Sequence, residues 1–128
     1  MKISAVRKKC FEKEGTVNVN KELVGASTGL LILKALARGP NYGYGIVRSV
    51  NEASGDFLIW QEGTIYPALR KLEKEGLLRS QWEDADNSRR RKYYYITARG
   101  REAIAEGQKE WKGFYRLVMN FTEVPDAC

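Results

Sequence analysis

The fold is decided by the stretch EGTIYPALRKLEKEGLL, residues 62–78. Ile65, Leu69 and Leu72 are spaced i, i+4 and i+7, so a helix places all three on one side. Good helix formers stand between them, and a glycine follows as a C-terminal stop signal. Thr64 is the expected N-cap, because its hydroxyl can accept a hydrogen bond from a free N–H group of the first turn. The stretch therefore predicts an amphipathic helix that begins after Thr64 and buries one apolar face.

A tyrosine and a proline stand at the entrance of this helix. With Thr64 as the N-cap, Pro67 falls in the first turn, where the N–H that it lacks has no intrahelical acceptor. Tyr66 then projects from the helix N-terminus, whose free N–H groups and positive dipole end favour phosphate. Such a helix suits the major groove of DNA, and its outward residues are Tyr66, Pro67, Arg70 and Lys74. The alternative is structural: prolines are common at helix starts, and the tyrosine packs against a neighbouring element.

The segment before this helix predicts two further helices. Hydrophobic residues recur near a period of 3.6 residues from about Lys21 to Ala37. Gly39 and Pro40 break that pattern, and Asn41 is the expected N-cap of a second, short helix that ends near the ASG sequence. The predicted inward residues are Leu23, Leu30, Ile32, Leu33, Leu36 and Ala37 in the first helix, and Ile46, Val47 and Val50 in the second.

The segment after the 62–78 stretch predicts a hairpin and a last helix. LLRSQW (77–82) and KYYYIT (92–97) have strand character and flank a polar loop, EDADNSRRR. Thr97 can cap a long helix that runs to about Phe121. The DFLIWQ sequence before the third helix reads as a brief strand or an extended connector. The order helix, helix, helix, strand, strand, helix predicts a mainly α (α+β) fold of the winged helix-turn-helix type.

The hairpin carries a four-residue basic run at its predicted tip, Arg89 to Lys92. Such a tip can follow phosphates or reach into a minor groove. Arg89 and Arg90 lie nearest the tip and are the stronger candidates, whereas Lys92 begins the strand and can point either way. The alternative is a solvated loop whose cations pair with its own acids, Glu83, Asp84 and Asp86.

The NYGYG sequence opens the second helix with two tyrosines, Tyr42 and Tyr44. Residues two apart cannot share one helix face, so we expect one ring to pack inside while the other can touch a phosphate. The structural role is favoured for Tyr44, and both roles stay open for Tyr42.

A heptad pattern marks the last helix. Apolar residues recur there in an a/d spacing over about two and a half heptads. The seam consists of Ile104, Gly107, Trp111, Phe114, Val118 and Phe121. A monomer could bury this seam against its own first helix. The seam is nevertheless too aromatic and too near the C-terminus for a solvated face, so a homodimer interface is the favoured interpretation.

Length and composition bound the function classes. The chain has 128 residues, 43% of them hydrophobic and 30% charged, as expected for one globular domain. No stretch approaches the roughly 18 consecutive apolar residues of a membrane span, and the N-terminus lacks an apolar signal core, so we expect a cytoplasmic protein. Cys10 and Cys128 match no disulfide framework or metal spacing and are interpreted as free thiols. With no histidine and no clustered nucleophile, we expect no catalytic site, metal or cofactor.

The net charge of +6 is unevenly distributed. Residues 1–20 hold five basic and two acidic side chains, so half of the excess lies in this segment. A basic balance indicates nucleic acid as a partner, but here the charge alone decides little.

Together these residues closely resemble the PadR family of bacterial winged-helix transcriptional regulators. The resemblance covers about residues 21–121, and its most specific parts are GPNYGYGI (39–46), GTIYPALRKLEKEGL (63–77) and RRRKYYYITARG (89–100). Each part alone is a weak signal, whereas all three in this order and spacing are specific. The expected organisation is a basic N-terminal extension (1–20), a DNA-binding domain (21–97), a dimerisation helix (98–124) and a tail (125–128).

The resemblance implies a homodimer that binds a palindromic operator in double-stranded DNA, usually as a repressor. It places Thr64, Tyr66, Pro67 and Arg70 on the recognition helix and Arg89, Arg90 and Arg91 on the wing. In multidrug-responsive members a tryptophan of the dimerisation helix stacks on planar aromatic effectors in an apolar cavity at the dimer centre. Trp111 stands at the matching position, so the same role is a hypothesis for it; the alternative is an ordinary interface tryptophan.

A hypothesis from another class is a ligand-binding or protein-interaction module that has the same fold but no specific operator binding. The acids near the wing and the modest charge of residues 21–128 leave room for it. The chain also departs from the family pattern by about 20 extra N-terminal residues and by Thr28-Gly29 in the first helix.

Overall fold

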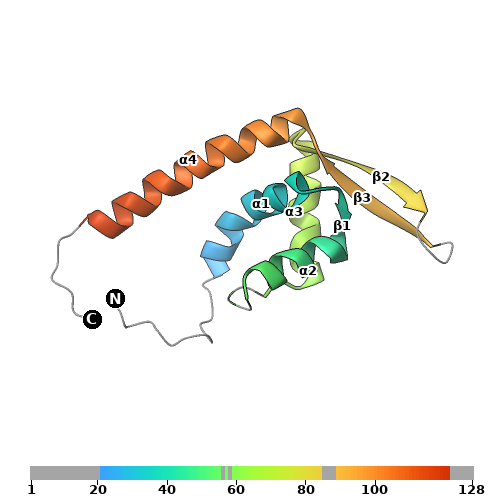
Figure 1. Cartoon of the computed structure of the whole chain (residues 1–128), viewed down its shortest axis with the longest axis horizontal. Coiled ribbons are helices and arrows are strands. Elements are labelled where there is room, and N and C mark those ends of the chain that lie inside the picture. The colour runs from blue at the N-terminus through green and yellow to red at the C-terminus, as the bar shows by residue number, and fades with distance from the viewer. Residues whose placement is uncertain (1–20, 56, 58, 85–88, 122–128) are drawn as a thin grey trace.

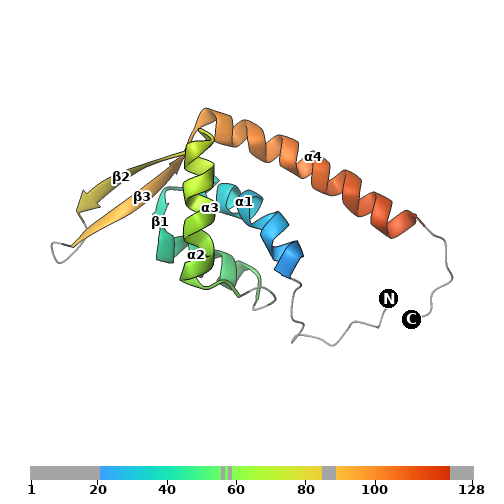
Figure 2. The ribbon, with the colours of Figure 1, turned by 180° about the vertical axis from the view of Figure 1, so that it is seen from behind.

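The computed structural model describes residues 21–55, 57, 59–84 and 89–121 (Figure 1). The elements are α1 (Lys21–Ala37), β1 (Asn41–Tyr42), α2 (Gly43–Ala53), α3 (Glu62–Lys74), β2 (Leu78–Asp84), β3 (Arg90–Ile96) and α4 (Ala98–Asn120). Helices α1, α2 and α3 pack together, the β2–β3 hairpin projects from them on one side, and α4 runs away on the other (Figures 1 and 2). The predicted mainly α, winged helix-turn-helix class is confirmed. No helix within the described ranges could span a membrane.

The core lies where the three short helices meet the base of the hairpin. Ile65 and Leu69 are fully buried and Leu72 nearly so, which confirms the predicted inward face of α3. Their partners are Ile32, Leu33 and Leu36 from α1, Ile46, Val47 and Val50 from α2, and Trp60, Leu78 and Tyr94. Burying each large aliphatic side chain contributes about 1.5–3 kcal/mol, so this cluster fixes α3 against the other helices. Leu23 was predicted to face inward but is exposed, whereas the next residue, Val24, packs against the core.

The start of α2 differs from the prediction. Asn41 does not cap the helix; it begins a short strand, β1, that pairs with β3 in a three-stranded antiparallel sheet of order β1-β3-β2. Tyr42 is in extended conformation (φ −99°, ψ 168°) and occupies the N-cap position without a side-chain cap. The Asn41 carboxamide oxygen instead accepts a hydrogen bond from the Tyr42 N–H at 2.9 Å. This third strand, which was not predicted, ties the start of α2 to the hairpin.

The start of α3 also differs. The helix begins at Glu62 after an extended Gln61, so Thr64 lies inside the first turn rather than at the N-cap. The Thr64 N–H bonds to the Gln61 carbonyl at 3.0 Å. Pro67 consequently lies inside the helix, where it removes the donor that would bond to the Gly63 carbonyl. The proline therefore costs α3 one hydrogen bond near its exposed N-terminal end.

The connector between α2 and α3 is held by one side chain. Trp60 is buried, and the Asn51 carboxamide bonds to both of its peptide groups: it accepts from the Trp60 N–H at 2.8 Å and donates to the Trp60 carbonyl at 3.1 Å. Among the described residues of the connector, 57 and 59–61, none forms a strand, which agrees with the extended alternative.

The hairpin is longer than predicted. The register pairs Leu78 with Ile96 and continues to Asp84 opposite Arg90, so β3 begins two residues before Lys92. Thr97 then caps α4 as expected: its hydroxyl accepts from the Gly100 N–H at 3.0 Å and donates to the Gly76 carbonyl at 2.8 Å.

The predicted N-terminal extension (1–20), the tail (125–128), Cys10 and Cys128 lie outside the described residues, as do the last residues assigned to the dimerisation helix, 122–124.

Candidate nucleic-acid interface

A hollow of about 640 Å³ lies between the N-terminal parts of α2 and α3 and the hairpin. Its lining is rich in cations and tyrosines: Tyr42, Gly43, Tyr44, Tyr66, Arg70, Glu73, Trp82, Arg89, Arg90, Arg91, Lys92 and Tyr94. We call this surface the basic hollow. Five cationic side chains face a single carboxylate in it, that of Glu73. An accumulation of positive charge on one concave face is suited to a polyanion.

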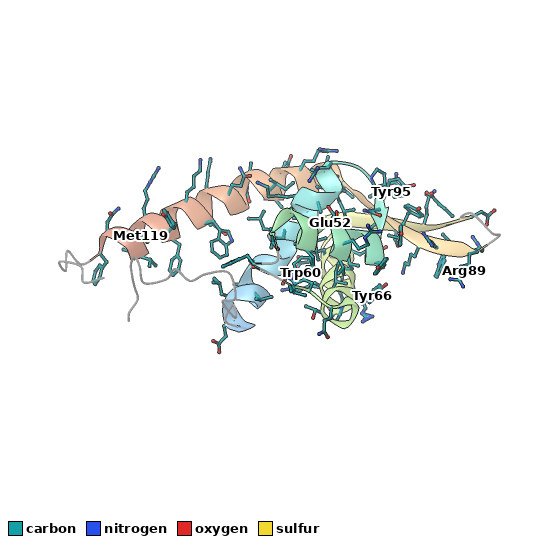
Figure 3. All side chains as sticks on the ribbon, turned by 60° about the horizontal axis from the view of Figure 1, so that its bottom comes forward. Glu52, Trp60, Tyr66, Arg89, Tyr95 and Met119 are labelled. Atoms are coloured by element: carbon teal, nitrogen blue, oxygen red, sulfur yellow. The ribbon has the colours of Figure 1, made fainter. Side chains whose placement is uncertain are left out.

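Helix α3 supplies one wall of the basic hollow. Burial of Ile65 and Leu69 turns the opposite side of the helix outward, and with it Tyr66 and Arg70. Tyr66 is 41% exposed, and Figure 3 shows its side chain on the outer side of α3. Its ring lies directly against Gly43 at the start of α2: a Cβ atom built there would stand 2.6 Å from the Tyr66 Oη. The glycine therefore lets the tyrosine ring rest on the α2 backbone.

Strand alternation divides the basic run of the hairpin between two faces. Arg90 shares the inner face of the sheet, toward α3, with Lys92 and the buried Tyr94. Its Nε lies 3.7 Å from the Asp84 Oδ1, in an exposed ion pair that contributes little to stability. Arg91 points to the outer face, where its guanidinium carbon lies 4.3 Å from the centroid of the Tyr42 ring.

Arg89 precedes β3 and stands at the far end of the hairpin (Figure 3). It is exposed, and it forms no hydrogen bond or ion pair with any residue in the described part of the chain. In the basic run, Arg90, Arg91 and Lys92 each contact another side chain, whereas no side-chain contact within the described residues fixes Arg89.

Two tyrosine hydroxyls of β3 are kept in the neutral form. Burial raises the pKa of Tyr94, and the nearby carboxylate of Glu73 raises it further. Glu73 in turn accepts a hydrogen bond from the Ser80 hydroxyl at 2.6 Å, which joins α3 to β2. On the outer face, a hydrogen bond to the Glu83 carboxylate raises the pKa of Tyr95. Glu73 of α3 and Glu83 of β2 are therefore both hydrogen-bonded within the protein.

The predicted DNA-binding residues divide into two groups. Tyr42, Tyr66, Arg70, Arg89, Arg90 and Arg91 line the basic hollow, whereas Thr64, Pro67 and Lys74 are exposed on α3 outside it. The structural role was favoured for Tyr44, and both roles were open for Tyr42. Tyr42 is half-buried, with its ring centroid 5.6 Å from that of Tyr93, while Tyr44 is 47% exposed.

Sequence reasoning gave no site role to Gly43, Glu73, Trp82 and Tyr94 of the hollow; it left the direction of Lys92 open and favoured a structural role for Tyr44. Alternation counted from the apolar Leu78 would have placed Trp82 on the inner face, since the two are four residues apart in one strand. No comparable local signal exists for Gly43, which depends on the approach of Tyr66 from another helix. The described residues contain no cluster of His, Cys, Asp or Glu side chains that could hold a metal ion.

A second surface lies at the other end of the molecule, and the predicted α4 seam divides along it. Ile104 packs against the core, and a Cβ atom at Gly107 would lie 3.2 Å from the Leu30 Cδ1, so this part of the seam is buried against α1. Phe114 and Val118 are exposed, and Phe121 is 77% exposed.

Between these parts, Trp111 is half-buried at the edge of an apolar groove of about 600 Å³. The groove is lined by Leu23, Val24, Ser27, Leu31, Lys34, Ala35, Arg38, Ser49, Val50, Ala53, Ser54, Phe57 and Trp111, and we call it the apolar groove.

Comparison with known proteins gives a consistent result. The model of the transcriptional regulator PadR-like family matches residues 32–106, more than half of the chain. Among solved structures, the chain is similar to a PadR family transcriptional regulator from Eggerthella lenta, with 33% identity and a TM-score of 0.71 over 80% of this chain and 88% of that one.

Two further structures are similar along nearly their whole length. A transcriptional regulator from Clostridium thermocellum is 25% identical, with a TM-score of 0.74 over 83% of this chain and 100% of that one. A PadR-like transcriptional regulator from Bacillus cereus is 27% identical, with a TM-score of 0.67 over 81% of this chain and 99% of that one.

Proposed function

The chain belongs to the PadR-like family of transcriptional regulators, and on this premise we propose that it is a homodimeric repressor that is released by a small aromatic effector. Members of the family are transcriptional regulators rather than enzymes, so the coarse function, a DNA-binding regulator, follows from membership. The operator, the dimer and the effector are the proposal.

The observation that carries the proposal is the charge of the basic hollow. Five cations and one internally bonded carboxylate lie on a concave face beside the exposed side of α3. In the proposed complex α3 enters a major groove, with Arg70 and Tyr66 near base edges and phosphates. Arg89 continues past the backbone toward the adjacent minor groove or its phosphates. The exposed α3 residues Thr64, Pro67 and Lys74 then lie along the same groove, outside the hollow.

Arg90 and Arg91 have different parts in this complex. Arg90 faces α3 and can exchange its exposed partner Asp84 for a phosphate. Arg91 is stacked on Tyr42, so it holds the hairpin against the start of α2 and presents Tyr42 to the backbone.

The dimer is supported by the exposed end of α4. Six large apolar side chains are exposed there: Phe114, Tyr115, Leu117, Val118, Met119 and Phe121. A contiguous apolar surface of this kind on a regulator needs a cover, and a second copy of the same helix provides a self-complementary one. A two-fold dimer presents two α3 helices, which suits a palindrome whose half-sites are about 34 Å, or a multiple of that, apart.

The effector site is supported by the apolar groove. Trp111 offers an indole face at its edge, and the lining is apolar apart from three serines, Lys34 and Arg38. A planar aromatic compound can stack on the indole while its body occupies the groove. The groove contacts both α4 and the end of α2, so a ligand that prefers one spacing of the two α3 helices shifts operator affinity.

The test measures binding of the purified protein to the DNA upstream of its own gene and to a scrambled duplex of equal length, at several salt concentrations. We expect two chains per site and a complex that persists at physiological salt on the native duplex only. Equal binding to both duplexes, fading together as salt rises, contradicts a specific operator. In a further arm, a planar aromatic dye is added to the complex; we expect it to release the wild type but not Trp111→Ala.

A further inference from the structure

One large apolar side chain of the basic hollow is more than half exposed and lies outside the hydrophobic core. Trp82 lies near the middle of the hairpin on β2, paired with Lys92 of β3. Its side chain is on the inner face of the sheet, the face that Leu78 and Ser80 turn toward the core and α3. Yet Trp82 is 56% exposed, and it forms no hydrogen bond within the described residues. Exposing the apolar surface of an indole to water is unfavourable, and a large exposed apolar side chain often marks a binding surface.

The position of Trp82 relates the two parts of the proposed interface. Toward the base of the hollow stand Tyr66 and Arg70 on α3, and toward the tip of the hairpin stands Arg89. If α3 lies in a major groove and Arg89 approaches the neighbouring minor groove, the strand between them faces the backbone that separates the two grooves. The side chain at that point of the inner face is Trp82.

We propose that Trp82 is a DNA-contacting residue of the wing, which lays its indole on the sugars of the backbone between the major groove read by α3 and the minor groove approached by Arg89. The inference rests on the proposed DNA-binding function and adds a residue to it. An indole suits this place because its flat apolar face matches a deoxyribose, while its single N–H can donate to a phosphate oxygen. The flanking cations Lys92 and Arg90 neutralise the phosphates on either side.

This contact has a signature that differs from that of the arginines. A cation that pairs with a phosphate releases counterions, so its removal reduces the salt dependence of binding. An apolar contact with the sugars releases none. Trp82→Ala is therefore expected to weaken binding by about tenfold, the size typical of a lost aromatic contact with nucleic acid, without a change in the salt slope. Because sugars carry no sequence information, the same factor is expected on the upstream and the scrambled duplex.

The experiment compares Trp82→Ala, Trp82→Phe, Arg89→Ala and Gln81→Ala on both duplexes across salt concentrations. Gln81 is the matched control, because it is exposed on the same strand but on the outer face of the hairpin. We expect Trp82→Phe to retain most of the affinity, Gln81→Ala to retain all of it, and Arg89→Ala to reduce the salt slope. If Arg89→Ala weakens binding and Trp82→Ala does not, the inference about Trp82 is wrong while the interface stands. If the wild type binds the upstream duplex and neither variant affects that binding, the hairpin is not part of the interface; if the wild type itself does not bind, the proposed DNA-binding function fails.

A second readout separates contact from folding. Acrylamide quenching is measured on the wild type and on Trp82→Phe, with and without saturating upstream duplex, so that the difference between the proteins isolates the Trp82 signal. Trp60 and Trp111 are present in both proteins and contribute the same background to both. We expect DNA to protect Trp82 from acrylamide. Full accessibility of Trp82 in the saturated complex overturns the proposal, even if Trp82→Ala has lost affinity through a weakened hairpin.

Discussion

The hairpin and the last turns of α4 both extend away from the helical core, in opposite directions, yet they are stabilised differently (Figure 3). Side-chain contacts connect the hairpin to α2 and α3. Arg91 stacks on Tyr42 at the start of α2 and Ser80 bonds to Glu73 of α3, while the hydroxyl of Tyr95 bonds to Glu83 between the two strands of the hairpin. Its exposed side chains are mostly charged, which water solvates well. The hairpin is therefore complete within one chain.

The end of α4 differs from the hairpin in both its contacts and its exposed side chains. Residues 112–121, at the end of α4, are all exposed, and six of their side chains are large and apolar. No hydrogen bond or ion pair in the described part of the chain ties residues 112–121 to another element. The comparison separates two kinds of protruding surface: one is mostly charged and is held by contacts within the chain, and the other is apolar and has no cover among the described residues. The second is the surface for which we propose a second copy of the chain as partner.

The largest effect is expected from a charge placed in the α4 seam. Val118→Asp puts a carboxylate where we propose that two α4 helices meet, and a buried, unpaired charge opposes association strongly. Since Val118 is exposed in the single chain, folding should be little affected. We expect monomers in sedimentation velocity and an operator affinity lowered roughly 100-fold, because two half-sites are no longer bound by one linked molecule.

The matched control is Lys109→Asp, an exposed position of α4 that lies off the seam. It introduces the same side chain and should leave both the dimer and the operator affinity intact. A Val118→Asp protein that remains dimeric would remove the end of α4 from the interface.

Much of this comparison was predictable from the sequence, because it depends on periodicity. The inward stripe Ile65, Leu69 and Leu72 repeats within one helix, and burial follows directly from it. The a/d spacing of α4 likewise marks one face, although only the structure divides it into a part that Leu30 covers and a part that nothing described covers. Patterns within one element are local, so sequence reveals them.

What the sequence did not reveal depends on contacts between distant segments. Thr64 has good N-cap chemistry, but the extended conformation of Gln61 starts α3 earlier, beside the buried Trp60. Strand β1 has two residues and no signal of its own; it exists because Tyr42 meets Tyr93 from the far hairpin. The division of the basic run into two faces depended on the exact residue at which β3 begins, and strand ends are set by pairing with the other strand.

A smaller effect is expected at the contact that fixes Tyr66. Gly43→Ala places a Cβ atom 2.6 to 2.8 Å from the Tyr66 ring, so the ring or the start of α2 must move. We expect thermal unfolding to show a loss of stability of about 1–3 kcal/mol, the range typical of overpacking. Operator affinity should also fall, because Tyr66 leaves its position beside Arg70.

Gly63→Ala is the control for this change. A Cβ atom at Gly63 would meet no atom within 4 Å, and alanine favours a helix by about 1 kcal/mol over glycine. This variant should be as stable as the wild type or more so. Equal stability of the two variants would contradict a tight contact between Gly43 and Tyr66.

The smallest and most specific effect concerns Arg89 and Arg91, which are two residues apart in the chain. Arg89 has no partner among the described residues, whereas Arg91 is stacked on Tyr42. We expect Arg89→Ala to reduce the slope of log affinity against log salt by about one, as for the loss of one phosphate contact. Arg91→Ala should leave the slope nearly unchanged and instead lower stability by about 0.5–1 kcal/mol, the value of an exposed cation–π contact. Equal slope changes in the two variants would mean that both arginines bind phosphate and that the Arg91–Tyr42 stack opens when DNA binds.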